Sequence, residues 1–386
     1  MTAPLQIGFI PLVDAAALIV AVDKGFAAAE GVDVTLVREV SWSNVRDKLN
    51  IGLFEAAHLL APVAIASSLG VGHVKVPIVA PFNLGINGNA ITVSPALHAA
   101  ILAEIDGDRF DPMATARALA RVVAARRKAG ADPLTFAMTF PFSTHNYQLR
   151  FWMAAGGVDP DEDVRLVVLP PPFMVESLEN GHVDGFCVGA PWNSIAVDHG
   201  VGHILHFVAD ILVHAAEKVL AIRQGFAEKN PEVVARLVRA LNRAAEFIEE
   251  PGNRVEAARM LARPERIGVD AEVIQRTLDG RLKISPDGTI RENGRYLLVG
   301  RESAGRPDPV QAAWLYSQMV RWAQTRVSEE ALRTAMAVFR PDLYDAALGI
   351  AGSPSSHPVG AFEGPEFDPR DIAAYLASFK IFRRPV

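Results

Sequence analysis

The chain has 386 residues, of which 50% are hydrophobic, so it can bury a large core divided over two or three lobes. Lys plus Arg total 38 and Asp plus Glu total 44, a formal net charge of −6, and the absence of a long basic tract argues against direct nucleic-acid binding. The single cysteine, Cys187, excludes an intrachain disulfide framework, and its apolar neighbours predict a buried strand position.

The first twenty residues, MTAPLQIGFIPLVDAAALIV, lack the basic start and the leading apolar stretch of a secretion signal. We therefore expect a cytoplasmic protein, or a periplasmic one if a leader has been removed. No window has the uninterrupted apolar length of a membrane-spanning helix, so no membrane span is expected.

The first ninety residues alternate strand-like and helical patterns. Short β-branched runs predict strands at 5–10, 32–40 and 56–62, and helical patterns lie between them at 15–31 and 43–54. This alternation is typical of βαβ units and a mostly parallel sheet, in which ligands lie beyond the carboxyl ends of the strands.

A second α/β set begins at residue 134. It has predicted strands at 134–140, 164–170 and 184–192, with a helix at 172–183. Residues 90–133 between the two sets predict one strand and then helices rich in alanine and arginine.

The remaining chain is expected to complete the first set. The strand-like runs from about residue 203 predict a return to the first lobe, followed by a mainly helical region broken by a loop at 285–296. The tail, 352–371, is rich in Gly, Pro and Ser and predicts an irregular surface wrap before a last helix.

These elements predict an α/β protein of two lobes with a ligand cleft between them. Lobe I comprises residues 1–93 and 213–386, including the helical C-terminal region, and lobe II comprises residues 94–212. Crossing segments between two lobes allow hinge closure on a solute.

Metal and covalent chemistry have weak support in the sequence. His199, His203 and His206 lie close together, but they have no cysteine partner and no HExxH helix. There is no GxSxG motif, no Walker loop and no GxGxxG after the first strand, and GINGNA at 85–90 precedes a strand rather than a helix. We therefore expect no metal, no cofactor and no catalytic residue, although distant residues could still assemble a catalytic arrangement.

Binding residues are easier to nominate. The polar run Ser143, Thr144 and His145 lies where a strand passes into a helix, a place that suits a small anion, although capping alone explains the hydroxyls. Trp42 lies at a similar turn, with Ser43 as the expected N-cap, and it is either a packing residue or a ligand contact. Lys218 lies at the edge of an apolar strand, where it is either solvated or faces the cleft as a countercharge.

Seven segments occur together and in an order that resembles one known family. They are GFIPLVDAAALIVAVDKGFAAAEGVDV (8–34), SWSNVRDKL (41–49), AAHLLAPV (56–63), GNAITVS (88–94), MTFPFSTHNYQLRFWMAAGG (138–157), LPPPFMVESLENGHVDGFCVGAPWN (169–193) and EKVLAIR (217–223). They resemble the nitrate- and bicarbonate-binding proteins of cyanobacterial ABC transporters and the related cytoplasmic NasS-type nitrate/nitrite sensors. The resemblance is dense over roughly the first 225 residues.

This resemblance implies the type 2 periplasmic-binding-protein fold and an oxyanion site. The positions that match the family's nitrate ligands are Trp42, Asn89, His145 and Lys218, with Ser143 and Thr144 beside them. Bicarbonate binders are expected to use an acidic residue with a bound cation, so Lys218 favours nitrate or nitrite. The chain departs from the family at Asn89, which replaces a longer glutamine, and at Ala190, which replaces a glutamate.

The resemblance and the N-terminus together predict a NasS-like sensor that controls a NasT-type RNA-binding antiterminator. The alternatives are the solute-binding subunit of a nitrate transporter, a bicarbonate receptor, and an enzyme on the same fold such as a thiamine-pyrimidine synthase. The sequence leaves open the choice between nitrate and nitrite, the affinity, the oligomeric state and the partner surface.

Overall fold

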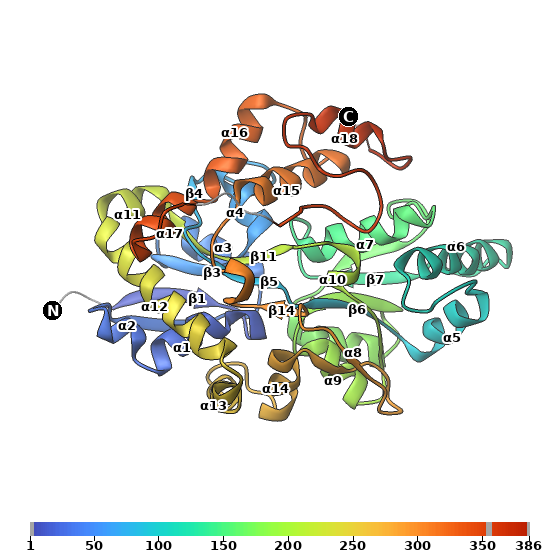
Figure 1. The fold of residues 1–386 in the computed structure, drawn as a ribbon. Helices are drawn as coiled ribbons and strands as arrows, with labels where there is room; N and C mark the ends of the chain where they lie inside the picture. The colour runs from blue at the N-terminus through green and yellow to red at the C-terminus, as the bar shows by residue number, and fades with distance from the viewer. Residues whose placement is uncertain (1–3, 353–356, 384–386) are drawn as a thin grey trace.

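The computed structural model describes residues 4–352 and 357–383, which build two mixed α/β layers side by side (Figure 1). The first sheet has the strand order β14-β5-β11-β3-β1-β2, with β4 paired to β11. Its strands are β1 (Leu5–Phe9), β2 (Val34–Arg38), β3 (Ala56–Leu60), β4 (Ile78–Val79), β5 (Asn83–Asn87), β11 (Ala216–Arg223) and β14 (Leu297–Leu298). Strands β1, β2 and β3 are parallel, whereas β11 runs antiparallel to β3, β4 and β5.

The second sheet has the order β10-β6-β9-β7-β8. Its strands are β6 (Asn89–Val93), β7 (Thr135–Met138), β8 (Arg165–Val168), β9 (Gly185–Gly189) and β10 (His203–Phe207). Strand β7 is parallel to β8 and β9, and β6 is antiparallel to both β9 and β10. Cys187 lies fully buried in β9, which confirms the strand position predicted for it.

Helices cover both sheets (Figure 1). Those around the first sheet are η1 (Val13–Ala15), α1 (Ala16–Asp23), α2 (Phe26–Ala29), α3 (Trp42–Asn50), α4 (Ala61–Leu69), α11 (Gln224–Lys229), α12 (Pro231–Glu249), η3 (Pro251–Asn253), α13 (Arg254–Leu261), α14 (Ala271–Asp279), η4 (Arg301–Ser303), α15 (Pro309–Arg321), α16 (Glu329–Val338) and α17 (Pro341–Leu348). Those around the second sheet are α5 (Pro95–Glu104), α6 (Pro112–Lys128), α7 (Thr144–Ala155), η2 (Pro171–Phe173), α8 (Met174–Glu179), α9 (Trp192–Asp198) and α10 (Val208–Ile211). The last helix, α18 (Ile372–Ala377), packs on α15.

Two expectations about strand partners differ from the structure. The strand-like run from residue 203 was expected to begin the return to the first lobe, although the lobe boundaries assign 203–212 to lobe II; β10 pairs with β6 in the second sheet, as those boundaries require, and only β11 returns. Strand β6 was expected to end lobe I, but it also lies in the second sheet, so the chain first crosses at Asn87–Gly88. An apolar strand has the same pattern in either sheet, because its sequence does not encode which strand it will pair with.

Local predictions were wrong at three places. The helix expected at 15–31 is divided into α1 and α2 at Gly25, whose φ of +75° ends a helical turn. The loop expected at 285–296 contains β13 (Ile290–Glu292), which forms a hairpin with β12 (Arg281–Lys283). The N-cap of α3 is Ser41 rather than Ser43, because the Ser41 side chain accepts a hydrogen bond from the Asn44 backbone N–H.

Within the described part of the chain, no helix is long and apolar enough to cross a membrane. The tail after residue 357 is irregular up to α18, as predicted. It is more than a surface wrap, because Val359 and Phe367 are buried against the main core.

Candidate functional site between the lobes

Elements of both lobes meet between the two sheets: from lobe I, η1, the start of α3, β3 and β11, and from lobe II, the start of β6 and the first turn of α7. They bring together a fully buried polar group that we call the interlobe cluster: Asp14, Trp42, His58, Asn89, Thr144, His145, Glu217 and Lys218. The lobes touch at this point, since the Val13 backbone N–H donates to the carbonyl oxygen of Ala190 at 2.9 Å. The cluster is therefore buried where the two lobes are in contact.

Lys218 lies inside β11 rather than at its edge, and its side chain is completely buried. Its ammonium nitrogen lies 2.9 Å from Asp14 Oδ2 and 3.0 Å from Glu217 Oε1. It also lies 5.5 Å from the centre of the Trp42 ring. Burial alone would lower the pKa of Lys218, but the two carboxylates outweigh burial and raise it, so the lysine is a permanent cation.

Asp14 is held by two donors from lobe I. Besides Lys218, His58 Nε2 lies 2.9 Å from Asp14 Oδ1. The Ile10 backbone N–H donates to His58 Nδ1 at 3.4 Å, so the proton of the neutral imidazole is on Nε2 and points at Asp14. Burial would raise the pKa of Asp14, but Lys218 and His58 lower it far below its usual range, so this carboxylate stays ionised.

Glu217 takes up the donors that the resemblance assigns to a bound anion. Asn89 Nδ2 donates to Glu217 Oε2 at 3.0 Å, and the Thr144 hydroxyl donates to the same oxygen. His145 Nδ1 lies 3.3 Å from Glu217 Oε1, and Lys218 contacts that oxygen as well. The planar carboxylate of one lobe therefore occupies the donors of the other lobe, as a small oxyanion would.

Asp14 Oδ2 is paired only with the Lys218 ammonium, and three further polar atoms of the cluster are buried with no hydrogen-bond partner among the described residues: Trp42 Nε1, Asn89 Oδ1 and His145 Nε2. Such atoms are costly to bury unless something pairs with them. His145 Nδ1 is shared between Thr139 Oγ1 at 3.1 Å and Glu217. Burial lowers the pKa of His145 to about 4 despite the nearby Glu217, so this imidazole is neutral at pH 7.

The charges of the cluster do not balance. With neutral histidines, two carboxylates face one ammonium, so one negative charge is in excess. This corrects the expectation that Lys218 stands as a spare countercharge, because Asp14 and Glu217 already neutralise it.

Five of the six predicted site residues lie in the interlobe cluster. Trp42, Asn89, Thr144, His145 and Lys218 lie in the interlobe cluster. Ser143 does not contribute its hydroxyl, because it caps α7 by accepting from the Asn146 N–H at 3.1 Å and donates to the Phe140 carbonyl oxygen.

Sequence reasoning missed Asp14, His58 and Glu217. Each is a polar residue within an apolar run, as in IPLVDAAAL, AAHLLAP and AEKVLAI, and that interruption is a usable signal. The histidines at 199, 203 and 206 do not converge: His203 stacks on His98, and His206 hydrogen-bonds to Thr115.

The fold and the buried cluster between two α/β lobes define a solute-binding protein of the type 2 periplasmic-binding-protein fold. The chain belongs to the NMT1-like family, whose model matches residues 1–262. It is 31% identical to the nitrate/nitrite binding protein NrtA of Synechococcus elongatus, over 97% of this chain and 86% of that protein. The crystal structure of the periplasmic nitrate-binding protein NrtA from Synechocystis PCC 6803 has a TM-score of 0.89 and 28% identity, and covers 98% of both chains.

Two further relatives are longer proteins. The chain is 33% identical to the nitrate import ATP-binding protein NrtC of Synechocystis and 32% identical to the bicarbonate transport ATP-binding protein CmpC of Synechococcus elongatus. It spans 55% of the length of each. These relatives confirm the resemblance to nitrate- and bicarbonate-binding proteins that the motifs indicated.

Proposed function

We propose that this chain binds a small monovalent oxyanion, nitrate or nitrite, in the cleft between its lobes. The observation that carries the proposal is the convergence of Asn89, Thr144 and His145 from one lobe with Lys218 from the other on a carboxylate-sized position, with the Trp42 ring beside Lys218. Relatives that are named as nitrate/nitrite binding proteins support the choice of anion.

The excess negative charge sets a condition on binding. An incoming anion has to displace the Glu217 carboxylate from Asn89 and Thr144, or enter together with a proton, because two negative charges cannot share one buried lysine without cost. His145 is the group placed to take that proton, since its Nε2 is buried and unpaired among the described residues. Ligand binding and lobe closure are then linked through Glu217, which belongs to lobe I but bonds to lobe II.

Bicarbonate is the second candidate, favoured by Glu217. Bicarbonate carries a hydroxyl that can donate a hydrogen bond to a carboxylate, whereas nitrate and nitrite have no donor. The resemblance treats a lysine and an acidic residue as alternatives that separate the two ligand classes, but this chain has both, as Glu217 and Lys218. Lys218 between two carboxylates occupies the place that a cation would take.

Calorimetric titration of the purified chain with nitrate, nitrite and bicarbonate tests this proposal. The sharpest variant is Trp42→Phe, which removes the unpaired indole N–H and replaces the indole with a smaller aromatic ring, and we expect it to weaken nitrate binding about tenfold. Lys48→Met is the matched control, because Lys48 pairs with Glu39 outside the cluster. Absence of anion binding, or binding unaffected by Trp42→Phe, would refute the site.

The biological role that we propose is a NasS-like sensor whose anion-bound state controls a NasT-type antiterminator. It is supported by the motif resemblance, whereas the named functions of the relatives favour the solute-binding subunit of an importer. The two roles differ in location, cytoplasmic or periplasmic, and in partner.

We propose a binding rather than a catalytic role, because the Cys187 thiol is buried, has a raised pKa and donates to Gln148.

A reconstituted assay separates these roles. The purified chain should suppress RNA binding by the antiterminator without nitrate and release it with nitrate, and Trp42→Phe should shift the nitrate concentration that this requires. If RNA binding is unchanged at every nitrate concentration while calorimetry reports anion binding, the sensor role is wrong and the anion site stands.

A further inference from the structure

The residue that follows α15 in lobe I contacts the turn of lobe II at the start of α7, which carries His145 (Figure 1). The Tyr147 hydroxyl donates to Gln324 Oε1 at 2.7 Å, and Gln324 Nε2 donates to the Pro141 carbonyl oxygen at 2.9 Å. We call this pair of hydrogen bonds the Gln324 latch. One side chain of lobe I thus bonds to lobe II on both sides of His145.

The way in which α15 ends fixes the position of Gln324. Helix α15 packs on α4 of lobe I, and Ala323 after it has a φ of +57°, the left-handed conformation that closes a helix. The Gln324 N–H then donates back to the Met319 carbonyl oxygen at 2.8 Å. The backbone of Gln324 is therefore held by lobe I, while its side chain bonds to lobe II.

The turn at the start of α7 has hydrogen bonds of its own. Asn146 Nδ2 donates to the Pro141 carbonyl oxygen at 2.8 Å, and the Asn146 N–H donates to Ser143 Oγ at 3.1 Å. These bonds lie within lobe II and keep the local shape of the turn. Gln324 therefore adds a contact between lobes rather than a bond on which the turn depends for its fold.

The C-terminal tail contacts α7 farther along. The Arg383 N–H donates to the Arg321 carbonyl oxygen of α15 at 2.9 Å, and its guanidinium lies 2.6 Å from Asp159 Oδ1 in the loop after α7. The Phe379 ring lies 5.3 Å from the Phe151 ring of α7, edge to face. The latch and the tail together contact α7 at its start, in its middle and beyond its end.

Burial of the interlobe cluster makes these contacts important for ligand exchange. Asn89, His145 and Lys218 are 0% exposed, so an anion reaches them only when the lobes move apart. Separation of the lobes breaks both hydrogen bonds of the latch, which slows entry and exit alike. Gln324 bonds to Pro141 and Tyr147 rather than to the cluster, so the latch is the same whether Glu217 or an anion occupies the donors.

We propose that Gln324 sets how fast the anion exchanges at the interlobe cluster, with little influence on how tightly the anion binds. This inference rests on the proposed nitrate or nitrite site and names the contact that regulates it. Gln324 is a positioning residue, because it holds the turn that carries His145 against lobe I without touching the anion.

Stopped-flow measurement of nitrate exchange by tryptophan fluorescence, together with calorimetry, tests the latch. Gln324→Met removes both hydrogen bonds, and we expect the association and dissociation rates each to rise about tenfold while Kd changes less than about threefold. Tyr147→Phe removes one of the two bonds and should raise both rates about threefold. The double variant should be no faster than Gln324→Met, because the two residues share one bond.

The matched control is Gln224→Met. Gln224 Nε2 donates to Glu228 Oε1 at 2.7 Å on the surface of lobe I, away from α7. This variant should exchange nitrate at the rate of the unaltered chain. The latch is wrong if Gln324→Met also keeps that rate, or if it weakens nitrate binding tenfold without a faster association.

Small-angle X-ray scattering without any anion separates failure of the latch from failure of the anion site. Gln324→Met should have a larger radius of gyration than the unaltered chain and Gln224→Met, because separated lobes become more populated. If calorimetry detects no nitrate or nitrite binding but Gln324→Met still expands, the anion site fails and the contact between lobes stands. Equal radii in all three proteins, with nitrate exchange unchanged, would overturn the latch.

Discussion

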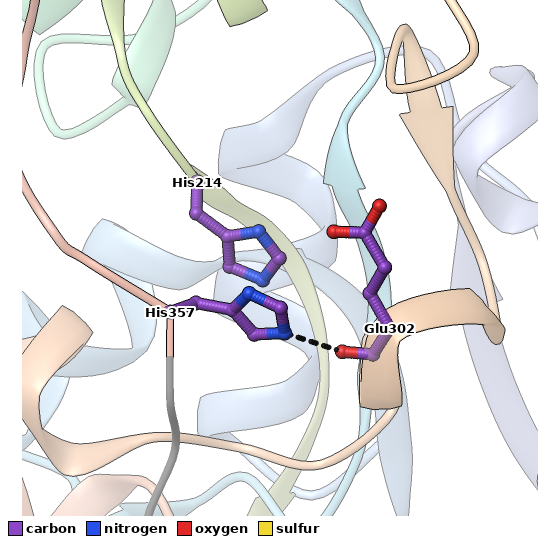
Figure 2. Close-up of side chains that lie close together, drawn as sticks. All are labelled: His214, Glu302 and His357. Carbon is purple, nitrogen blue, oxygen red and sulfur yellow. Dashed lines mark hydrogen bonds between the residues drawn. The ribbon is translucent and has the colours of Figure 1, made fainter.

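In the interlobe cluster the cation is Lys218, completely buried between Asp14 and Glu217. A second group, which we call the hinge cluster, comprises His214, Arg295 and Glu302 near the segment where the chain returns to lobe I (His214 and Glu302 are drawn in Figure 2), and its cation is Arg295, 42% exposed and 3.1 Å from both Glu302 Oε2 and His214 Nδ1. Both clusters hold a cation, carboxylate and imidazole together. The difference is access to water: Lys218 cannot leave without stranding two buried carboxylates, while Arg295 can be solvated elsewhere. The same chemical groups are thus fully buried in the interlobe cluster and partly solvated in the hinge cluster.

Removing the cation should give the largest contrast between the two clusters. Lys218→Met leaves Asp14 and Glu217 buried without their shared partner, and we expect the free energy of unfolding to fall by about 3–5 kcal/mol. Arg295→Met should cost under about 1 kcal/mol, because that pair is partly solvated. Urea unfolding of both variants measures this, and equal losses would mean that burial does not distinguish the clusters.

Acid should weaken the interlobe cluster through His145. Its pKa falls from 6.5 in the unfolded chain to about 4 in the folded one, so between these values only the unfolded chain binds the proton. Stability from this group is complete above pH 6.5 and is lost as the pH falls toward 4, by about 3 kcal/mol in all. Urea unfolding from pH 7 to pH 4.5 should show a shallower decline in His145→Gln, whereas the exposed control His199→Gln should follow the unaltered chain.

Neutralising one carboxylate in each cluster should change nitrate affinity only in the interlobe cluster. Glu217→Gln removes the negative charge that competes with an incoming anion, and we expect nitrate to bind about tenfold more tightly. Glu302→Gln, at the hinge, should leave nitrate affinity unchanged. Calorimetry on both variants provides the test. Bicarbonate binding that disappears in Glu217→Gln would instead identify a ligand that donates a hydrogen bond to this residue.

The fold class could be predicted from the sequence because the hydrophobic pattern of each strand or helix depends only on neighbouring residues. Alternating strand and helix patterns identified two α/β sets, but they could not assign β6 to the second sheet, since pairing depends on distant partners. The resemblance brought together Trp42, Asn89, His145 and Lys218, and the structure places these residues in one buried cluster.

The electrostatics of the site could not be predicted in the same way. Asp14 precedes Lys218 by about two hundred positions, and nothing in a linear pattern indicates that β1, β3 and β11 bring Asp14, His58 and Lys218 into contact. The hinge cluster was missed for the same reason, because His214 lies about eighty positions before Arg295 and Glu302 and meets them only through tertiary packing.

The smallest predicted effect concerns the turn that positions Trp42 in the interlobe cluster. The sequence predicted Ser43 as the cap of α3, but the Ser41 side chain accepts from the Asn44 N–H at 3.3 Å, which makes Trp42 the first residue of the helix. Ser41→Ala should therefore lower the free energy of unfolding by about 1 kcal/mol, and Ser43→Ala by only a few tenths. Because the cap fixes the start of α3, Ser41→Ala should also weaken nitrate binding slightly. A variant that loses stability but binds nitrate as tightly as the unaltered chain would contradict this expectation. Urea unfolding and calorimetry on this pair of variants therefore test whether the cap affects both nitrate affinity and helix stability or helix stability alone.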